Sequence, residues 1–448
     1  MKRLAIVSSY NEECGVAFYS SRLKPHLIAA GYQVDVKRLP LSLLRISHPA
    51  AIRRKGDDEI KRIAREIADY DAVLLQFEPG LYGSSSQTSY RRVAHLLKHA
   101  KQAIITVHGF DRAISAGSLP SLVLGGRFDI ALGEVARFAS SNRVRSFWHY
   151  VASAKHVSVM TFCRGDQTIL ERFYDMPRIT SFPITYFDEG EVSAIRSASD
   201  RERVLQQFGL DPRKKYFSVC GFLSPYKGHL TAIKALEFLP DDWHLAIVGG
   251  EHPHGIEAGR DIGNYVRQLL AFLLETERPN GKEESGLLTN SDLGELMTHA
   301  DLERIDIRKD ILKRSEFKHF LPRKELRQRV NFLGQVSDEQ MPQLYAALDY
   351  FVHPYMKTVE GQSGSGPATM ALEFGTRSLF SNAPVFREMN LYFDGAMQFF
   401  NIGNFVELAE SLSRFGNFEN DLRINRERAL KRYNPAAMVN TYRELLAS

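Results

Sequence analysis

The sequence predicts an α/β protein with two halves, each a Rossmann-like parallel sheet covered by helices. Three observations support this prediction. Short apolar runs of strand length alternate with longer amphipathic stretches, as in βαβ units. The apolar runs are nearly continuous, which is typical of strands buried on both faces. The alternation weakens over residues 185–204 and then begins again, so the chain divides into two series.

The first series contains six apolar runs and two clear helical stretches. The helices are expected over Val16–Ala30 and Asp58–Tyr70, where apolar residues recur at three- and four-residue spacing. The expected strands are Arg3–Ser9, Gln33–Leu39, Asp71–Phe77, Gln102–Phe110, Lys155–Phe162 and Arg178–Ile184.

The second series repeats this alternation. Its expected strands are Lys215–Leu223, Trp243–Gly250, Arg329–Val336, Asp349–Tyr355 and Arg377–Ala383, and its expected helices include Gly228–Leu239 and Asp338–Leu348. Ligands of such sheets bind beyond the carboxyl ends of the strands, so the cleft between the two halves is the expected site.

These patterns set the predicted domain boundaries. Residues 1–185 form the first domain, 186–204 a polar connector with a short helix, 205–420 the second domain, and 421–448 terminal helices that cross back to the first. The segment 251–329 is long, charged and helix-like, although a short helix would be enough to join the two strands on either side of it. We interpret this segment as a helical insertion. Its charges fit either a solvated face or a surface that binds a partner.

Composition excludes several classes of protein. The net charge is only +5, with 58 basic and 53 acidic residues interspersed, so nucleic-acid binding is not expected. Three separated cysteines without a CxxC pair fit a reducing compartment. The N-terminus lacks a signal-peptide pattern, and no apolar run approaches the ~18 residues of a membrane span. We expect a cytoplasmic protein, with peripheral contact to the inner face of a membrane kept open.

A glycine- and serine-rich stretch, VEGQSGSGPATMALEFG, covers Val359–Gly375. It leads into an apolar helix with Pro367 in the first turn and Gly375 at the C-terminal end, which are favoured positions for these residues. The N–H groups at a helix N-terminus bind anions. The stretch therefore fits a phosphate-binding loop, while an ordinary strand-to-helix turn is the alternative.

Eight pieces of the chain, in order, resemble family 4 of the retaining glycosyltransferases, which have the GT-B fold. The resemblance covers most of the chain except Glu251–Arg329. The pieces are CGVAFYSSRLKPHLIAAGYQV, LLQFEPGLYG, ITVHGF, GFLSPYKGHLTAIKAL, LAIVGG, VNFLGQVSDEQMPQLYAALDYFVHP, GSGPATMALEFGTRSLFSN and RALKRYNPAAMVNTYRELL.

The resemblance implies transfer of a sugar from a nucleotide-sugar donor, with retention of configuration, to a glycan or lipid-linked glycan in cell-surface polysaccharide biosynthesis. It implies two domains facing a central cleft and no metal or other cofactor. His254 and His252 offer no third ligand at metal spacing, and an exposed loop explains them better.

The resemblance also assigns roles to residues. Lys227 would meet the donor diphosphate, and His108 would position the transferred sugar or donate a hydrogen bond to it. Glu78 would lie on the acceptor side, and Glu360 near the reacting sugar. The implied donor-binding residues are Gly15, Val16, Lys227, Gln362, Ser363, Gly364, Ser365, Gly366 and Glu373. A surface lysine, a structural histidine and surface carboxylates are the alternatives.

Two departures from the family pattern weaken these assignments. Phe222 stands where the family has an arginine, so Lys227 would act alone or with a substitute such as Arg164 or Arg112. Alignment on Gly375 places Gln362 and Met370 at the family's two glutamates, whereas Glu360 and Glu373 are thirteen residues apart. A catalytically silent GT-B protein that binds nucleotide or glycan, and another GT-B enzyme such as a sugar-nucleotide epimerase, therefore remain as alternatives.

Overall fold

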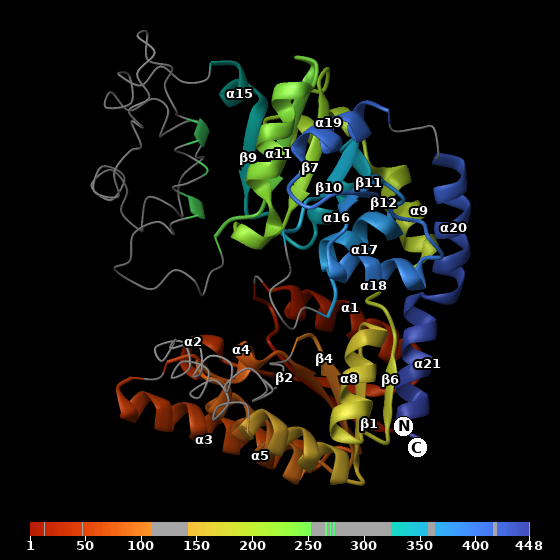
Figure 1. Ribbon diagram of the computed structural model, residues 1–448. Coiled ribbons are helices and arrows are strands. Elements are labelled where there is room, and N and C mark those ends of the chain that lie inside the picture. Colours follow the sequence, from red (N-terminus) through yellow and green to blue (C-terminus); the bar gives the residue numbers. More distant parts are fainter. Residues whose placement is uncertain are drawn as a thin grey trace, which may run out of the picture. The chain divides into compact units, whose positions relative to one another are not determined.

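The structure is a computed structural model. It describes residues 1–12, 14–46, 48–109, 142–251, 265–266, 269, 272–273, 324–356, 363–414 and 419–447. The chain forms two compact units, shown with their element labels in Figure 1. The first contains Met1–Tyr186, Val359–Gly366 and Lys431–Ser448, and the second contains Phe187–Thr358 and Pro367–Leu430. Most of the predicted insertion lies outside the described residues.

The described residues of the first unit form a six-stranded parallel sheet in the order β2-β1-β3-β4-β5-β6. The strands are β1 (Arg3–Ser8), β2 (Gln33–Arg38), β3 (Ala72–Phe77), β4 (Ala103–Val107), β5 (Val157–Thr161) and β6 (Ile179–Ser181). Strand order reverses between β1 and β3, and ligands of doubly wound sheets bind beyond the carboxyl ends of the strands at such a point.

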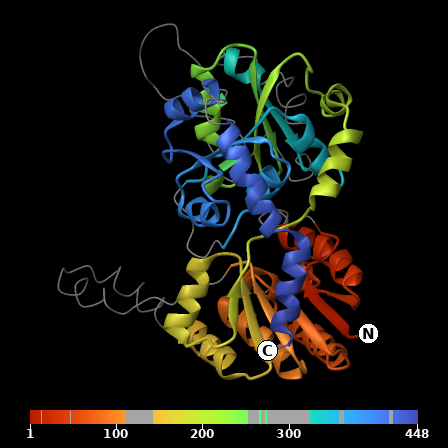
Figure 2. The ribbon, with the colours of Figure 1, turned by 90° about the vertical axis from the view of Figure 1, so that its right-hand side faces the viewer.

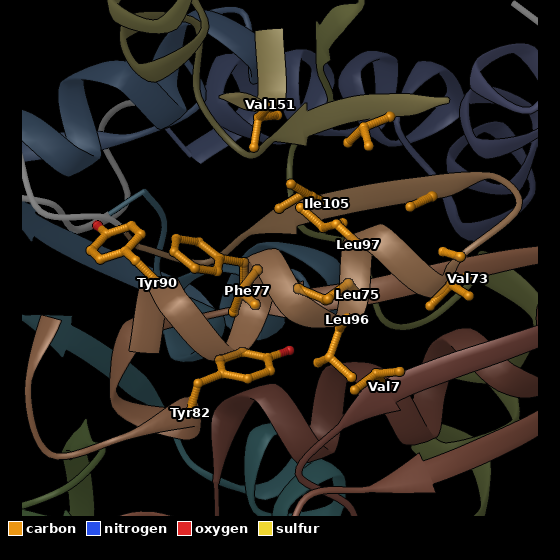
Figure 3. Packing of buried hydrophobic residues seen from close by; sticks show 14 of the residues in the cluster. Val7, Val73, Leu75, Phe77, Tyr82, Tyr90, Leu96, Leu97, Ile105 and Val151 are labelled. Atoms are coloured by element: carbon orange, nitrogen blue, oxygen red, sulfur yellow. The ribbon is translucent and has the colours of Figure 1, made fainter. Parts of the chain in front are cut away.

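One face of this sheet carries an apolar core. Figure 3 shows Leu75 and Phe77 of β3 close to Tyr82, Tyr90 and Leu96 from the covering helices. The covering helices are α2 (Leu41–Leu44), α3 (Ala50–Ile67), α4 (Pro79–Tyr82), α5 (Ser86–His99), a helix over residues 142–153 and α8 (Arg164–Tyr174). The apolar spacing that predicted a helix at Asp58–Tyr70 therefore lies on the buried side of α3.

The opposite face is covered by α1 (Gly15–Ala29) together with α21 (Pro435–Leu445). Asn434 begins α21 by accepting a hydrogen bond from the Ala437 N–H, and Pro435 occupies the first turn. Both the first and the last described residues thus belong to the first unit, and Figure 2 shows α1 and α21 there in red and blue.

The second unit's described residues also form a six-stranded parallel sheet, ordered β12-β11-β10-β7-β8-β9. Its strands are β7 (Lys215–Cys220), β8 (Trp243–Val248), β9 (Val330–Gly334), β10 (Tyr350–His353), β11 (Arg377–Ser381) and β12 (Gln398–Phe400). Read from β9, this is the Rossmann order, with its reversal between β7 and β10.

Helices of the second unit follow its strands or enter from the connector. They are α9 (Glu189–Ala198), α10 (Arg201–Gln207), α11 (His229–Ala235), α15 (Lys324–Arg329), α16 (Met341–Ala347), α17 (Gly366–Glu373), α18 (Pro384–Tyr392), α19 (Phe405–Ser413) and α20 (Glu419–Arg432). No helix within the described ranges combines the length and apolar character needed to cross a bilayer.

The connector differs from its prediction. A single short helix was expected over residues 186–204, but the segment contains α9 and begins α10. Asp188 forms a capping box with Glu191, and Asp200 accepts from the first N–H groups of α10. Because Asp200 caps a new helix just after α9 ends at Ala198, two helices start in this segment instead of one.

Candidate functional site

The site of the second unit lies where its strand order reverses. The chain leaving β7 runs through Gly221 to a 3-10 turn over Pro225–Lys227, and the chain leaving β10 continues to Tyr355. The backbone joins these segments, because the Met356 N–H donates to the Tyr226 carbonyl at 2.7 Å. Residues from two neighbouring strand ends therefore meet at one edge of the sheet.

Among the predicted site residues that the structure describes, only Lys227 has a buried cationic side chain. This side chain is 5% exposed. Its ammonium group donates a hydrogen bond to the Tyr355 hydroxyl. The Nζ atom lies 4.3 Å and 5.1 Å from the ring centres of Tyr355 and Tyr226. Among the described residues no carboxylate lies within ion-pair distance of Lys227.

A buried cation without a counter-ion is costly unless a ligand supplies the negative charge. The two histidines nearest to Lys227 do not add charge. Burial, with a smaller effect of the nearby Lys227, lowers the pKa of His229 and of His353 to about 3, so both are neutral at pH 7. The arrangement thus presents one cation among neutral groups, which suits an anion.

Glycines make the close packing of this turn possible. Gly228 has φ +70°, and a Cβ there would lie 1.8 Å from the Pro354 carbonyl oxygen. Gly221 has φ +121°, and its missing side chain leaves room for the Lys227 stem at 3.0 Å. Both conformations favour glycine strongly. The Lys-Gly pair in the sequence therefore has two explanations. The backbone of the turn requires glycine at position 228, and Lys227 supplies the cation.

The glycine-rich loop is described only from Ser363 onward. Glu360 and Gln362, predicted near the reacting sugar and in the donor site, lie outside the described residues. Pro367 is in the first turn of α17, and Gly375 has φ +59° just beyond its end, which confirms both predicted helix positions. Glu373 is only 6% exposed, so the alternative of a solvent-facing carboxylate is wrong.

Packing accounts for two glycines of the loop. A Cβ on Gly364 would lie 2.8 Å from the Ile184 side chain, and one on Gly366 would lie 2.6 Å from the Tyr186 hydroxyl. Ser363 and Ser365 are buried, and the Ser363 hydroxyl has no hydrogen-bond partner among the described residues. The role of these four residues in phosphate binding stays a prediction.

The predicted residues of the first unit gather at the carboxyl ends of β1, β3 and β4. Gly15 begins α1, and Val16 beside it is buried. Among the described residues, a Cβ on Gly15 would meet no atom within 4 Å apart from its chain neighbours and the backbone of α1. The space beside this helix start is therefore open. Glu78 precedes α4 and is partly buried, and its charge acts on Arg45.

Arg45 is a cation at this edge that the sequence analysis missed. Its guanidinium donates to the Gly80 carbonyl at 2.7 Å, and burial lowers its pKa while Cys14, Glu12 and Glu78 oppose that effect. Nothing in its local sequence, LLRIS, distinguishes it from a surface arginine.

His108 follows β4 and lies among neutral side chains. Its Nε2 is 2.8 Å from Oε1 of Gln76, and its ring packs edge-on against Tyr19 and Phe162, with centres at 5.1 Å and 4.9 Å. Burial lowers the pKa of His108 to about 3, so it is neutral at physiological pH. The sequence signal for Gln76 was available, since it is the one polar residue of the run AVLLQF.

Within the described ranges, no three His, Cys, Asp or Glu side chains are arranged to hold a metal ion. His252 and His254 lie outside these ranges.

Comparison with known proteins identifies the fold. No protein-family model matches the chain, and no curated protein matches it. Among solved structures, Anabaena HepE in complex with UDP has 14% identity, covers 100% of both chains and gives a TM-score of 0.58. Sucrose-phosphate synthase from Thermosynechococcus elongatus has 16% identity over 100% of both chains, with a TM-score of 0.58.

A third similar structure is that of WaaG, a glycosyltransferase involved in lipopolysaccharide biosynthesis. It has 15% identity and a TM-score of 0.52, and the match covers 96% of this chain and 95% of WaaG. These likenesses, with the two six-stranded parallel sheets, show that the chain has the two-domain α/β GT-B fold.

Proposed function

We propose that this protein is a glycosyltransferase that moves a sugar from a nucleotide-sugar donor to an acceptor hydroxyl. The observation that carries the proposal is Lys227, a buried ammonium without a carboxylate partner in the described part of the chain, at the strand-order reversal of a Rossmann sheet. A diphosphate supplies the charge that this lysine lacks. As the sugar leaves, charge grows on the diphosphate, and a fixed cation there favours the transition state.

The donor proposal has support from the similar structures. HepE has been crystallised with UDP and with UDP-glucose, so uridine nucleotides are the first to test. We further propose transfer with retention, in which the acceptor hydroxyl attacks from the face that the diphosphate leaves. A diphosphate oxygen takes the hydroxyl proton, so the protein needs no separate base and no metal ion at this step.

For the acceptor we propose a glycan or lipid-linked glycan of cell-surface polysaccharide biosynthesis, reached in the cytoplasm. WaaG acts in lipopolysaccharide biosynthesis, which supports this class. His108 and Glu78 at the first unit's strand ends are the proposed sugar- and acceptor-side residues, and Glu360 or Gln362 acts near the reacting sugar.

Donor turnover tests the proposal. Purified protein is incubated with UDP-, GDP-, ADP- and dTDP-sugars, and thermal shift and release of nucleoside diphosphate are measured with and without EDTA. We expect one donor to stabilise the protein and to be hydrolysed slowly, with both effects lost in Lys227→Ala and unaffected by EDTA. Stabilisation without any release, even with glycan acceptors, would favour a silent binding protein, and no stabilisation by any donor would refute the proposal.

A further inference from the structure

The neighbours of His108 determine the protonation state of its ring as well as the position of the ring. In the parallel register, Gln76 of β3 pairs with Thr106 of β4. Side chains alternate along a strand, and His108 is two positions after Thr106. The side chains of Gln76, Thr106 and His108 therefore project from one face of the sheet. Gln76 is fully buried, and its Oε1 lies 2.8 Å from His108 Nε2. This is the ring's one hydrogen bond to a side chain in the described part of the chain.

The other neighbours of the His108 ring are aromatic. Tyr19 of α1 and Phe162 after β5 pack against it edge-on. No charged group of the described residues contributes to the lowered pKa of His108, and burial raises the pKa of Tyr19 well above its usual value. His108 is therefore a neutral imidazole, with one ring nitrogen protonated and the other carrying a lone pair.

A chain of hydroxyl groups joins α1, α21 and β4. The Tyr19 hydroxyl lies 3.1 Å from the Met438 sulfur and 3.0 Å from the Tyr442 oxygen. The Thr106 hydroxyl lies 2.7 Å from the Tyr442 oxygen. Each of these hydroxyl groups can donate or accept, so the chain is compatible with either proton direction.

The Gln76 amide oxygen faces His108, at 2.8 Å from Nε2. The Gln76 amide nitrogen meets no acceptor at full hydrogen-bond geometry among the described residues. The amide oxygen is therefore the atom of Gln76 that meets the His108 ring.

We propose that Gln76 is a positioning residue that holds His108 as the Nε2–H tautomer, so that Nδ1 accepts a hydrogen bond from a hydroxyl of the bound sugar. The carbonyl oxygen of Gln76 can only accept, so Nε2 must carry the proton. His108 is then an acceptor toward substrate, and not the donor that the family resemblance suggested. The sugar as ligand rests on the proposed function, whereas the tautomer does not.

Nuclear magnetic resonance of protein labelled with ¹⁵N-histidine tests the tautomer without any substrate. His108→Ala identifies the His108 signals. We expect the wild-type ring to be the Nε2–H tautomer and to remain neutral at pH 5. Gln76→Glu should keep this tautomer and raise the histidine pKa, and Gln76→Leu should abolish the preference. Gln102→Leu is the matched control, since Gln102 binds the Leu446 carbonyl in the same unit.

An Nδ1–H tautomer, or a charged His108 at pH 6, would overturn the proposal. The second experiment measures kinetics with the nucleotide-sugar donor that the wild-type protein accepts. Gln76→Leu should lower kcat/KM about tenfold or more, and Gln76→Glu should retain activity only above the raised pKa of His108. Equal losses at every pH in the Glu variant would show a merely structural role. If wild type accepts no donor, the proposed function fails, while the resonance arm still decides the tautomer.

Discussion

Replacing Lys227 by methionine separates a ligand-binding lysine from a structural one. Methionine keeps the apolar stem against Gly221 and the two tyrosine rings but removes the charge. Without ligand, the variant loses a charged hydrogen bond of about 1.5–3 kcal/mol and ring interactions of about 0.5–2 kcal/mol. It also escapes the desolvation cost of a buried ammonium, which is several kcal/mol. The free energy of unfolding should therefore change by no more than about 1 kcal/mol.

Nucleotide binding should respond very differently. A charge-assisted contact between an ammonium and a diphosphate contributes about 1.5–3 kcal/mol, so its loss should weaken the affinity about 10- to 150-fold. Urea denaturation of the ligand-free protein and calorimetric titration with UDP, or with the nucleotide that the donor panel identifies, measure the two quantities.

The matched control for this experiment is Lys234→Met. Lys234 also lies over two rings, those of Phe272 and Phe405, at 5.5 Å and 5.7 Å, but it is on α11 and half-buried. It should change neither quantity by a large amount. The reasoning is refuted if Lys227→Met lowers the unfolding free energy by more than about 2 kcal/mol and binds nucleotide like wild type.

Three further predictions follow from the two sheet edges. Gly15→Ala should leave the melting temperature unchanged, since its Cβ meets no atom of the described residues within 4 Å beyond its own helix and chain neighbours. It should weaken nucleotide binding about tenfold, because the added methyl group would keep the ligand from the backbone there. Unchanged binding would remove Gly15 from the site. Gly228→Ala should destabilise by more than about 3 kcal/mol because of positive φ and the Pro354 carbonyl, and a smaller loss in denaturation would show that the turn adapts. The unfolded chain protonates His353 below about pH 6.5, whereas burial lowers its folded pKa to about 3, so stability falls as pH decreases through this window. His353→Phe, which keeps the stack on Phe380, should therefore reduce the loss between pH 7 and pH 5 by about 2 kcal/mol, and an equal loss in both proteins would contradict the assigned neutrality.

The sequence by itself determined the α/β class and most of the elements. Apolar runs such as Asp71–Phe77 and the spacing within Asp58–Tyr70 are local patterns, and both became the expected element. Pro367 and Gly375 marked the limits of α17 because their backbone preferences are intrinsic. The short strand β12 was missed, since three residues carry too little periodicity to be recognised.

Tertiary structure alone decided what surrounds each candidate residue. Lys227 meets Tyr355 across 128 positions of sequence, and Tyr442 reaches Thr106 across 336. The sequence could place a lysine after a strand, but it could not show that this lysine is buried without a carboxylate among the described residues. Burial and the partners of a charge depend on which strands become neighbours, and that order follows from packing the whole sheet.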